Sequence, residues 1–302
     1  MIQTDVLNCG SGSVGTWYDG CKVVPKDFTK AFLMAPSASI DLTSGTLDET
    51  VIAGLIKKGL LVPLNDTLQI AEAGAKSNIQ TLPNKREIYI SSGLYKFTID
   101  FEANVCLVKS MHRLAKKKWQ LLLLDSEGKL FFDNKAGQLN GFEIQSLIVD
   151  NEAVNDGGSK FAMFTVSIQL TPDGTKGYNE RRSFILSDDF DFSIVNGIQD
   201  VKLASLTLTA ANFTLSVLAG CDGSTPILGL ATANFKVIKA TDGSTVAATV
   251  TDQGNGVYKL ANVALIAGSY VVQLYDSVLG YPVADILEEA FYQSNALPVV
   301  LT

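Results

Sequence analysis

The chain has 302 residues, a length that at ~100–200 residues per domain suits two or three domains. Hydrophobic residues make up 47% of it and charged residues 18%, a balance that excludes disorder, collagen and mucin-like stalks. The 24 basic residues are outnumbered by 31 acidic ones, which gives a net charge of −7. The chain as a whole is therefore not built to neutralise phosphates, and sequence-specific DNA or RNA binding is disfavoured.

The composition also restricts catalysis and metal binding. His112 is the only histidine, and the four cysteines, Cys9, Cys21, Cys106 and Cys221, form no CxxC pair. A zinc site or a Ser-His-Asp triad would depend on that one imidazole. Because no Walker loop, nucleophile elbow or HExxH motif occurs either, we expect no catalytic residues, no cofactor and no bound metal.

The ends of the chain and its apolar runs bear on location. Residues 1–5 have neither a basic nor an apolar region, so we expect no signal peptide and folding in a cytoplasm. Apolar runs such as 121–124 are far shorter than the ~20 residues needed to span a bilayer, so we expect no membrane partner. Oxidation would allow Cys9 and Cys21 to pair, whereas a cytoplasm favours free thiols.

Residues 1–40 are predicted to form an irregular, extended arm that needs a partner surface, because glycines and prolines interrupt every period. Residues 10–15 match GxGxxG, but no helix start follows and no alternating strands and helices surround the motif. We therefore interpret it as a loop that orders on contact. Trp17 and Tyr18 within the arm suit a protein interface, with core packing as the plainer alternative.

Residues 41–200 are predicted to form a β-sandwich or barrel with a packed α-helix. A capping box at Thr46–Glu49 opens a short helix over 47–58, and a second, amphipathic helix is expected over 103–118. The strands are expected at 94–101, 119–124, 129–132, 142–149, 161–170 and 183–192.

Residues 201–302 are predicted to form a C-terminal immunoglobulin-like β-sandwich, since Lys and Arg become rare and short strands alternate with turn signals. The overall fold class is therefore mainly β. The strands of this domain are expected at 203–208, 213–218, 233–239, 245–251, 256–260 and 269–275.

Three charged clusters have both a functional and a plain interpretation. The basic run from Lys109 to Lys118 contains His112 and could contact phosphates, but a solvated helix end is favoured. Arg181 and Arg182 suit salt bridges between subunits, or an exposed strand edge. The carboxylates of 188–191 lack the spacing of an EF-hand, so we interpret them as a charged strand end.

Four consecutive segments resemble virion structural proteins of tailed bacteriophages, specifically the β-sandwich-plus-helix subunits that stack as rings in tail tubes and head-to-tail collars. These segments are the hairpin 119–132, the strand 142–150, the loop 151–158 and the strand 161–170. An appended immunoglobulin-like domain is frequent in that family. The opening residues 7–10 and the Gly-rich arm are closest in character to ring proteins of crAss-like phages.

The resemblance implies a homo-oligomeric ring in a virion, assembled in the host cytoplasm. By analogy, residues 1–40 and 150–160 would bridge to the next copy or layer, and the implied partners are further copies of the chain and adjacent tail, collar or fibre subunits. Genomic DNA would only pass through the lumen, where a net negative charge avoids sticking. The implied subunit interface comprises Trp17, Tyr18, Asn155, Asp156, Gly157, Gly158, Arg181 and Arg182.

A second interpretation is an exported surface adhesin or glycan-binding protein. In that case the immunoglobulin-like half and aromatic side chains such as Trp17, Tyr18 and Tyr281 would contact sugars. An enzyme that depends on His112 is the third and least supported class.

Overall fold

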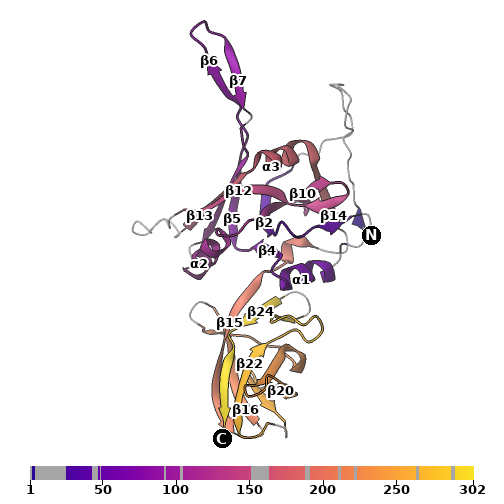
Figure 1. Ribbon diagram of the computed structural model, residues 1–302, viewed down its shortest axis with the longest axis vertical. Coiled ribbons are helices and arrows are strands. Elements are labelled where there is room, and N and C mark those ends of the chain that lie inside the picture. The colour runs from indigo at the N-terminus through magenta and orange to yellow at the C-terminus, as the bar shows by residue number, and fades with distance from the viewer. Residues whose placement is uncertain are drawn as a thin grey trace. The chain divides into compact units, whose positions relative to one another are not determined.

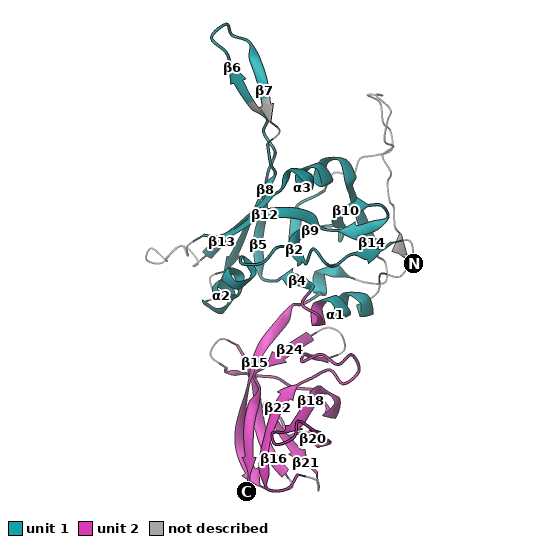
Figure 2. Ribbon diagram, in the orientation of Figure 1, with its two compact units in different colours: residues 1–55, 60–195 teal, residues 56–59, 196–302 magenta. Residues whose placement is uncertain are grey.

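The chain folds into two units, seen in a computed structural model (Figures 1 and 2). Unit 1 comprises residues 1–55 and 60–195, and unit 2 comprises residues 56–59 and 196–302. The structure describes residues 2–3, 25–42, 47, 49–91, 93–102, 105–150, 163–187, 191–209, 212–220, 223–262, 265–286 and 290–302.

Unit 1 is built mainly of β-strands with a few short helices. Its strands are β1 (Ile2–Gln3), β2 (Phe28–Met34), β3 (Ile40–Asp41), β4 (Leu61–Leu64), β5 (Thr67–Ala73), β6 (Asn78–Thr81), β7 (Glu87–Ser91), β8 (Lys96–Glu102), β9 (Gln120–Asp125), β10 (Leu130–Lys135), β11 (Gln138–Asn140), β12 (Phe142–Val149), β13 (Met163–Leu170) and β14 (Arg182–Ser187). Its helices are α1 (Glu49–Lys57, which ends in unit 2), α2 (Val105–Leu114), α3 (Pro172–Lys176), the π-helix η1 (Gly177–Arg181) and the 3-10 helix η2 (Phe192–Ile194).

A twelve-stranded sheet organises unit 1 around β9. Along one edge β9 pairs with β2, and along the other it pairs first with β10 and then with β12. The sheet runs in the order β1-β14-β10-β9-β12-β13-β8-β5, while β6 and β7 pair only with each other. All six residues of β9 are buried, which explains why this strand has no polar alternation.

The helix α2 packs on the core through one stripe of side chains. Met111 is buried, and Leu107, Val108, Leu114 and Ala115 pack against the same cluster. The helix ends where Trp119 Nε1 donates a hydrogen bond of 2.8 Å to the carbonyl of Leu114, one of the last carbonyls, which no turn of the helix can satisfy.

Unit 2 consists of two facing sheets. Its strands are β15 (Ile198–Thr209), β16 (Asn212–Ala219), β17 (Thr225–Pro226), β18 (Phe235–Lys239), β19 (Thr245–Val246), β20 (Thr249–Asp252), β21 (Val257–Ala261), β22 (Gly268–Leu274), β23 (Ala284–Ile286), β24 (Ala290–Ser294) and β25 (Leu297–Leu301), with a 3-10 helix η3 (Thr232–Asn234). One sheet has the order β20-β21-β16-β15-β24-β23 with β17 beside β16, and the other has the order β19-β18-β22-β25.

The two sheets of unit 2 enclose one hydrophobic core. Phe213, Leu215 and Val217 alternate inward along β16, as expected for a strand with one buried face. The Tyr258 hydroxyl lies inside that core, where it has a hydrogen-bond partner because it donates to the carbonyl of Ile227 at 2.8 Å. Burial raises the pKa of Tyr258 to about 12.

Lys57 is the buried cation of unit 2. Its Nζ contacts carboxylate oxygens of both Asp276, at 2.9 Å, and Asp285, and its side chain is only 4% exposed. Burial alone would raise the pKa of Asp276, but hydrogen bonds from Lys57 and from the turn amides of Val278 and Leu279 lower it overall. The ion pair therefore stabilises the ionised form of Asp276.

The expected fold class is confirmed, since strands dominate and sheets pack face to face with helices against them. The helix expected over 47–58 spans 49–57, and the one expected over 103–118 spans 105–114. The expected hairpin 119–132 corresponds to β9 and β10, and the strand expected at 142–149 corresponds to β12. The strand expected at 183–192 corresponds to β14 over 182–187, residues 188–190 lie outside the described part, and η2 begins at Phe192.

Two expectations are corrected by the structure. Residues 28–34 do not belong to an extended arm, because β2 is buried on both faces and lies beside β9. Its run Phe-Thr-Lys-Ala-Phe-Leu-Met lacks the polar alternation of a surface strand, and that absence is the physical signal of burial. No strand is expected between the helix over 47–58 and the strand at 94–101, whereas the structure has β4, β5 and the hairpin of β6 and β7 there.

Replacing the buried lysine tests the stability of unit 2. Lys57→Met leaves two carboxylates without their cation, so we expect the free energy of unfolding of unit 2 to fall by about 3 kcal/mol. Because the folded pKa of Asp276 is depressed, the wild-type advantage is present above the ordinary Asp pKa and is lost as the pH falls through the folded value. Hydrogen exchange of peptides from 268–301 against urea, at several pH values, measures both effects. Lys202→Met, at an exposed position, is the control, and equal losses in both variants would contradict the prediction.

Candidate interaction surfaces

A tight helical turn between β13 and β14 carries the main polar network of unit 1. Thr171 caps α3, since its hydroxyl accepts a hydrogen bond of 2.9 Å from the amide of Gly174, and Pro172 occupies the first turn, where no amide donor is needed. The helix then widens into the π-helix η1. Within η1, Tyr178 is buried in the core, and Arg181 is the last residue of the π-helix.

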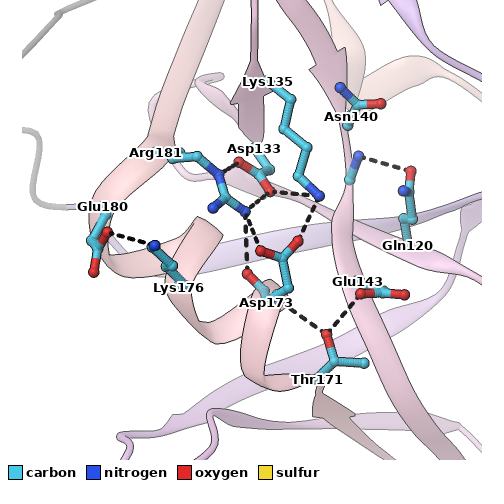
Figure 3. A network of polar contacts seen from close by, with 12 residues as sticks. Gln120, Asp133, Lys135, Asn140, Glu143, Thr171, Asp173, Lys176, Glu180 and Arg181 are labelled. Atoms are coloured by element: carbon cyan, nitrogen blue, oxygen red, sulfur yellow. Dashed lines mark hydrogen bonds and ion pairs between the residues drawn. The ribbon is translucent and has the colours of Figure 1, made fainter.

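A bidentate ion pair fixes this turn on β10 (Figure 3). Arg181 Nε and Nη2 each donate a hydrogen bond of 2.8 Å to one carboxylate oxygen of Asp133, whose side chain is fully buried. Lys135 lies 3.6 Å from the same carboxylate and donates a 2.7 Å bond to Asp173, which lowers the pKa of Asp173. A Cβ on Gly177 would lie 2.4 Å from Asp133 Oδ2, so only glycine allows the turn to approach this closely.

Tyr178 connects this turn to the strands β5 and β8. Its ring packs against the rings of Tyr95, Phe97 and Phe142 at centroid distances of 4.7, 5.5 and 5.1 Å. Its hydroxyl donates a 2.6 Å hydrogen bond to Glu72, near the end of β5. Burial and this carboxylate both raise the pKa of the Tyr178 hydroxyl, which keeps it a hydrogen-bond donor.

Beyond this point β5 and β8 continue as a two-stranded ribbon of residues 74–93. From here on we call this ribbon the arm; it is a different segment from the N-terminal arm expected at 1–40. Figure 1 shows the hairpin of β6 and β7 extending beyond the remaining strands of unit 1. The ribbon closes tightly at its base, where an added Cβ on Gly93 would lie 2.1 Å from the backbone oxygen of Lys76. This close approach forms a neck that requires glycine on one strand.

The tip of the arm is a well-defined turn. The amide of Lys85 donates to the carbonyl of Leu82 at 2.9 Å, and the amide of Leu82 donates to the carbonyl of Arg86 at 2.8 Å. Pro83 suits the first central position of such a turn, and Lys85 takes the left-handed conformation, with φ of 64°, that closes a three-residue hairpin loop. Asn84 Oδ1 accepts a hydrogen bond from the Arg86 amide.

The arm exposes apolar side chains without enclosing a core. Ile79, Ile88 and Tyr89 are 51%, 46% and 57% exposed. An isolated two-stranded hairpin is marginally stable in water, and exposed apolar groups on such a ribbon are typical of a contact surface. From the sequence, no strand is predicted in the arm. Its signal is the pair of strand-forming runs, Ile79–Thr81 and Glu87–Tyr89, around a Pro-Asn turn.

Arg181 and Arg182 are the predicted interface residues that the structure describes. Arg181 binds Asp133 and Asp173 within its own chain, so its charge is already paired there. Arg182 lies over the ring of Tyr178 at 4.5 Å, and neither arginine stands on a fully exposed strand edge. The other predicted interface residues, Trp17, Tyr18, Asn155, Asp156, Gly157 and Gly158, lie outside the described residues.

The structure also describes some of the other charged residues and cysteines that the sequence analysis singled out. His112, Lys109 and Arg113 are exposed on α2, as expected for a solvated helix end. Asp191 caps η2 by accepting a 2.7 Å hydrogen bond from the Ser193 amide, and residues 188–190 lie outside the described part. Cys106 is disulfide-bonded to a partner outside the described residues, where Cys9 and Cys21, expected as free thiols, also lie.

Neither a metal cluster nor a membrane-spanning helix is found in the described ranges. No group of three or more His, Cys, Asp or Glu side chains there could hold a metal ion. No helix among the same residues is long and apolar enough to cross a membrane.

Comparisons with known proteins identify no family. No family model and no curated protein matches the chain. Among solved structures, it is similar at 11% identity and a TM-score of 0.19 to SGBP-B of the mixed-linkage glucan utilization locus of Bacteroides ovatus, in complex with a mixed-linkage heptasaccharide. The match covers 78% of this chain and 62% of that one, so it spans less than two thirds of the other chain.

Breaking the bidentate pair tests whether it fixes the turn. Arg181→Met removes the cation from a fully buried carboxylate, and we expect the free energy of unfolding of unit 1 to fall by about 3 kcal/mol. Urea denaturation followed by hydrogen exchange of peptides from β9 and β10 measures the change. Lys176→Met, which removes an exposed partner of Glu180 on the same turn, should cost less than about 0.5 kcal/mol. A comparable loss in both variants would show that the pair has no special role.

A second variant tests the neck of the arm. Gly93→Ala places a methyl group against the Lys76 backbone, so the two strands must separate there. We expect amide exchange in 74–91 to accelerate about tenfold, the equivalent of ~1.4 kcal/mol, while β9 stays protected. Gly74→Ala is the matched control, since no atom lies within 4 Å of its added Cβ. Unchanged exchange in Gly93→Ala would exclude a constrained neck.

Proposed function

We propose that this protein is a structural subunit of a tailed-phage virion that assembles with copies of itself into a ring of the tail or the head-to-tail collar. The single observation that carries the self-assembly is the arm, a ribbon with exposed apolar side chains that extends from a well-packed domain. The virion assignment rests on the resemblance of residues 119–132, 142–158 and 161–170 to ring-forming subunits.

The physical argument for assembly is the cost of leaving such a ribbon unpaired. Its outer backbone groups and its apolar side chains favour a partner, and natural proteins rarely expose a long hairpin of this kind without one. Within the described residues, β5 pairs only with β8 and β4 only with β2, so the sheet also has edges on which another strand can add. Both features suit a subunit that contacts its neighbours repeatedly.

The proposal assigns partners and location in the same terms. The partners are further copies of the chain and adjacent tail, collar or fibre subunits, and genomic DNA passes through the lumen of the ring. The location is the virion, with assembly in the host cytoplasm. The overall charge of −7 supports passage of DNA without adhesion.

Shortening the arm tests self-assembly directly. Because Lys76 and Gly93 already lie side by side, residues 77–92 can be replaced by Asn-Gly to close the ribbon at the neck. We expect the full-length chain to form closed rings in electron micrographs and in mass measurements across a concentration series. The shortened chain should remain monomeric with β9 protected from exchange. A full-length chain that is monomeric at every concentration would refute the proposal.

A further inference from the structure

The arm carries a charge opposite to that of the chain as a whole. Residues 74–93 contain Lys76, Lys85 and Arg86 against the single carboxylate of Glu87, a net charge of +2. Because the whole chain has a charge of −7, the remaining residues sum to −9. The positively charged arm of one copy is attracted to the negatively charged remainder of another copy. Such charge complementarity steers association and selects the contact site.

The arm also presents a defined apolar pair beside these charges. Ile79 and Tyr89 are register partners, so their side chains share one face of the ribbon, whereas the Gln80–Ile88 pair lies on the other. Lys85 and Arg86 follow at the tip, and both are exposed. Tyr and Arg are enriched in protein interfaces because they combine large contact area with hydrogen bonding.

An acidic face that complements the basic arm lies on the part of the sheet formed by β12, β13 and β8. Asp100 accepts a 2.6 Å hydrogen bond from Thr165, and Asp150 accepts a 3.2 Å bond from Ser167, so all four side chains lie on the same outer face. Ile148 pairs with Ser167 and is 53% exposed there. This acceptor face therefore places an exposed apolar side chain beside two carboxylates.

We propose that the arm of one copy docks on the acceptor face of a second copy. Lys85 and Arg86 pair with Asp100 and Asp150, and Ile79 and Tyr89 pack against Ile148. The inference rests on the proposed self-assembly and names its contact surfaces. Thr165 and Ser167 contribute only small side chains to this face.

A nucleic acid is the other occupant that a basic ribbon could bind, and the charges favour a second copy. Glu87 follows directly after Lys85 and Arg86, and the attached body is strongly acidic. Both features repel a phosphate backbone, which needs several cationic contacts for appreciable affinity at physiological salt. They do not oppose docking on two carboxylates.

Charge reversal tests the proposal in the full-length chain. Lys85→Glu with Arg86→Glu, and separately Asp100→Lys with Asp150→Lys, should each raise the concentration required for assembly at least about tenfold, because like charges then face each other. Mixing the two variants should restore assembly, since each arm then meets an oppositely charged face. Lys109→Glu with Arg113→Glu, the same change on exposed residues of α2, should assemble like the wild type.

The outcomes separate this inference from the proposed function. If the arm variant assembles like the wild type, or if the mixture fails while each variant retains protected β9 amides, the docking is wrong and self-assembly stands. If the wild type itself never assembles, both are wrong. If a duplex DNA gel shift is abolished by the arm reversal while assembly is unchanged, nucleic acid is the occupant and the docking is overturned.

Discussion

The buried contact between Asp133 and Arg181 is the constraint on which the arm depends. A fully buried carboxylate is costly unless its charge is matched, and two parallel hydrogen bonds of 2.8 Å supply that match. The guanidinium can reach it only because Gly177 lets the turn approach. The same turn carries Tyr178, whose hydroxyl holds Glu72 at the base of the ribbon. An ion pair in the core is therefore linked, through one aromatic ring, to a feature that projects into solvent.

This arrangement explains how a ribbon without a core can have a defined base. Tyr178 contacts both strands of the ribbon, through the Glu72 carboxylate on β5 and through the rings of Tyr95 and Phe97 around the start of β8. Beyond the neck at Gly93, the β6–β7 ladder and the tip turn hold the strands together. Stability must therefore decrease from the base to the tip, which is the gradient expected of a segment that orders fully on contact.

Patterns among neighbouring residues predicted those helices and strands that depend on neighbouring residues alone. The amphipathic pattern over 103–118 predicted α2, and the two strand-like runs within 119–132 predicted the β9–β10 hairpin. The β6–β7 hairpin was missed because both of its faces are exposed, which removes the alternation that marks a half-buried strand. The link from Tyr178 to Glu72 joins residues 106 positions apart, and no spacing rule reaches that far. The ion pair of Arg181 with Asp133 was missed for the same reason, because two adjacent arginines in a sequence do not show which distant carboxylate they contact.

Because Arg181 forms ion pairs within its own chain, other cations must supply the contacts between copies. Arg181 is neutralised by Asp133 and Asp173, Arg182 lies over Tyr178, and Lys57 and Lys30 are buried. A charge already satisfied within the fold contributes little to an interface, because moving it to a new partner only exchanges one ion pair for another. The exposed cations of unit 1 include Lys109 and Arg113 on α2 and Lys85 and Arg86 at the tip of the arm. Of these two sets, only that on the arm is accompanied by an exposed apolar pair on a projecting ribbon, and this combination makes the arm the stronger candidate for contact between copies.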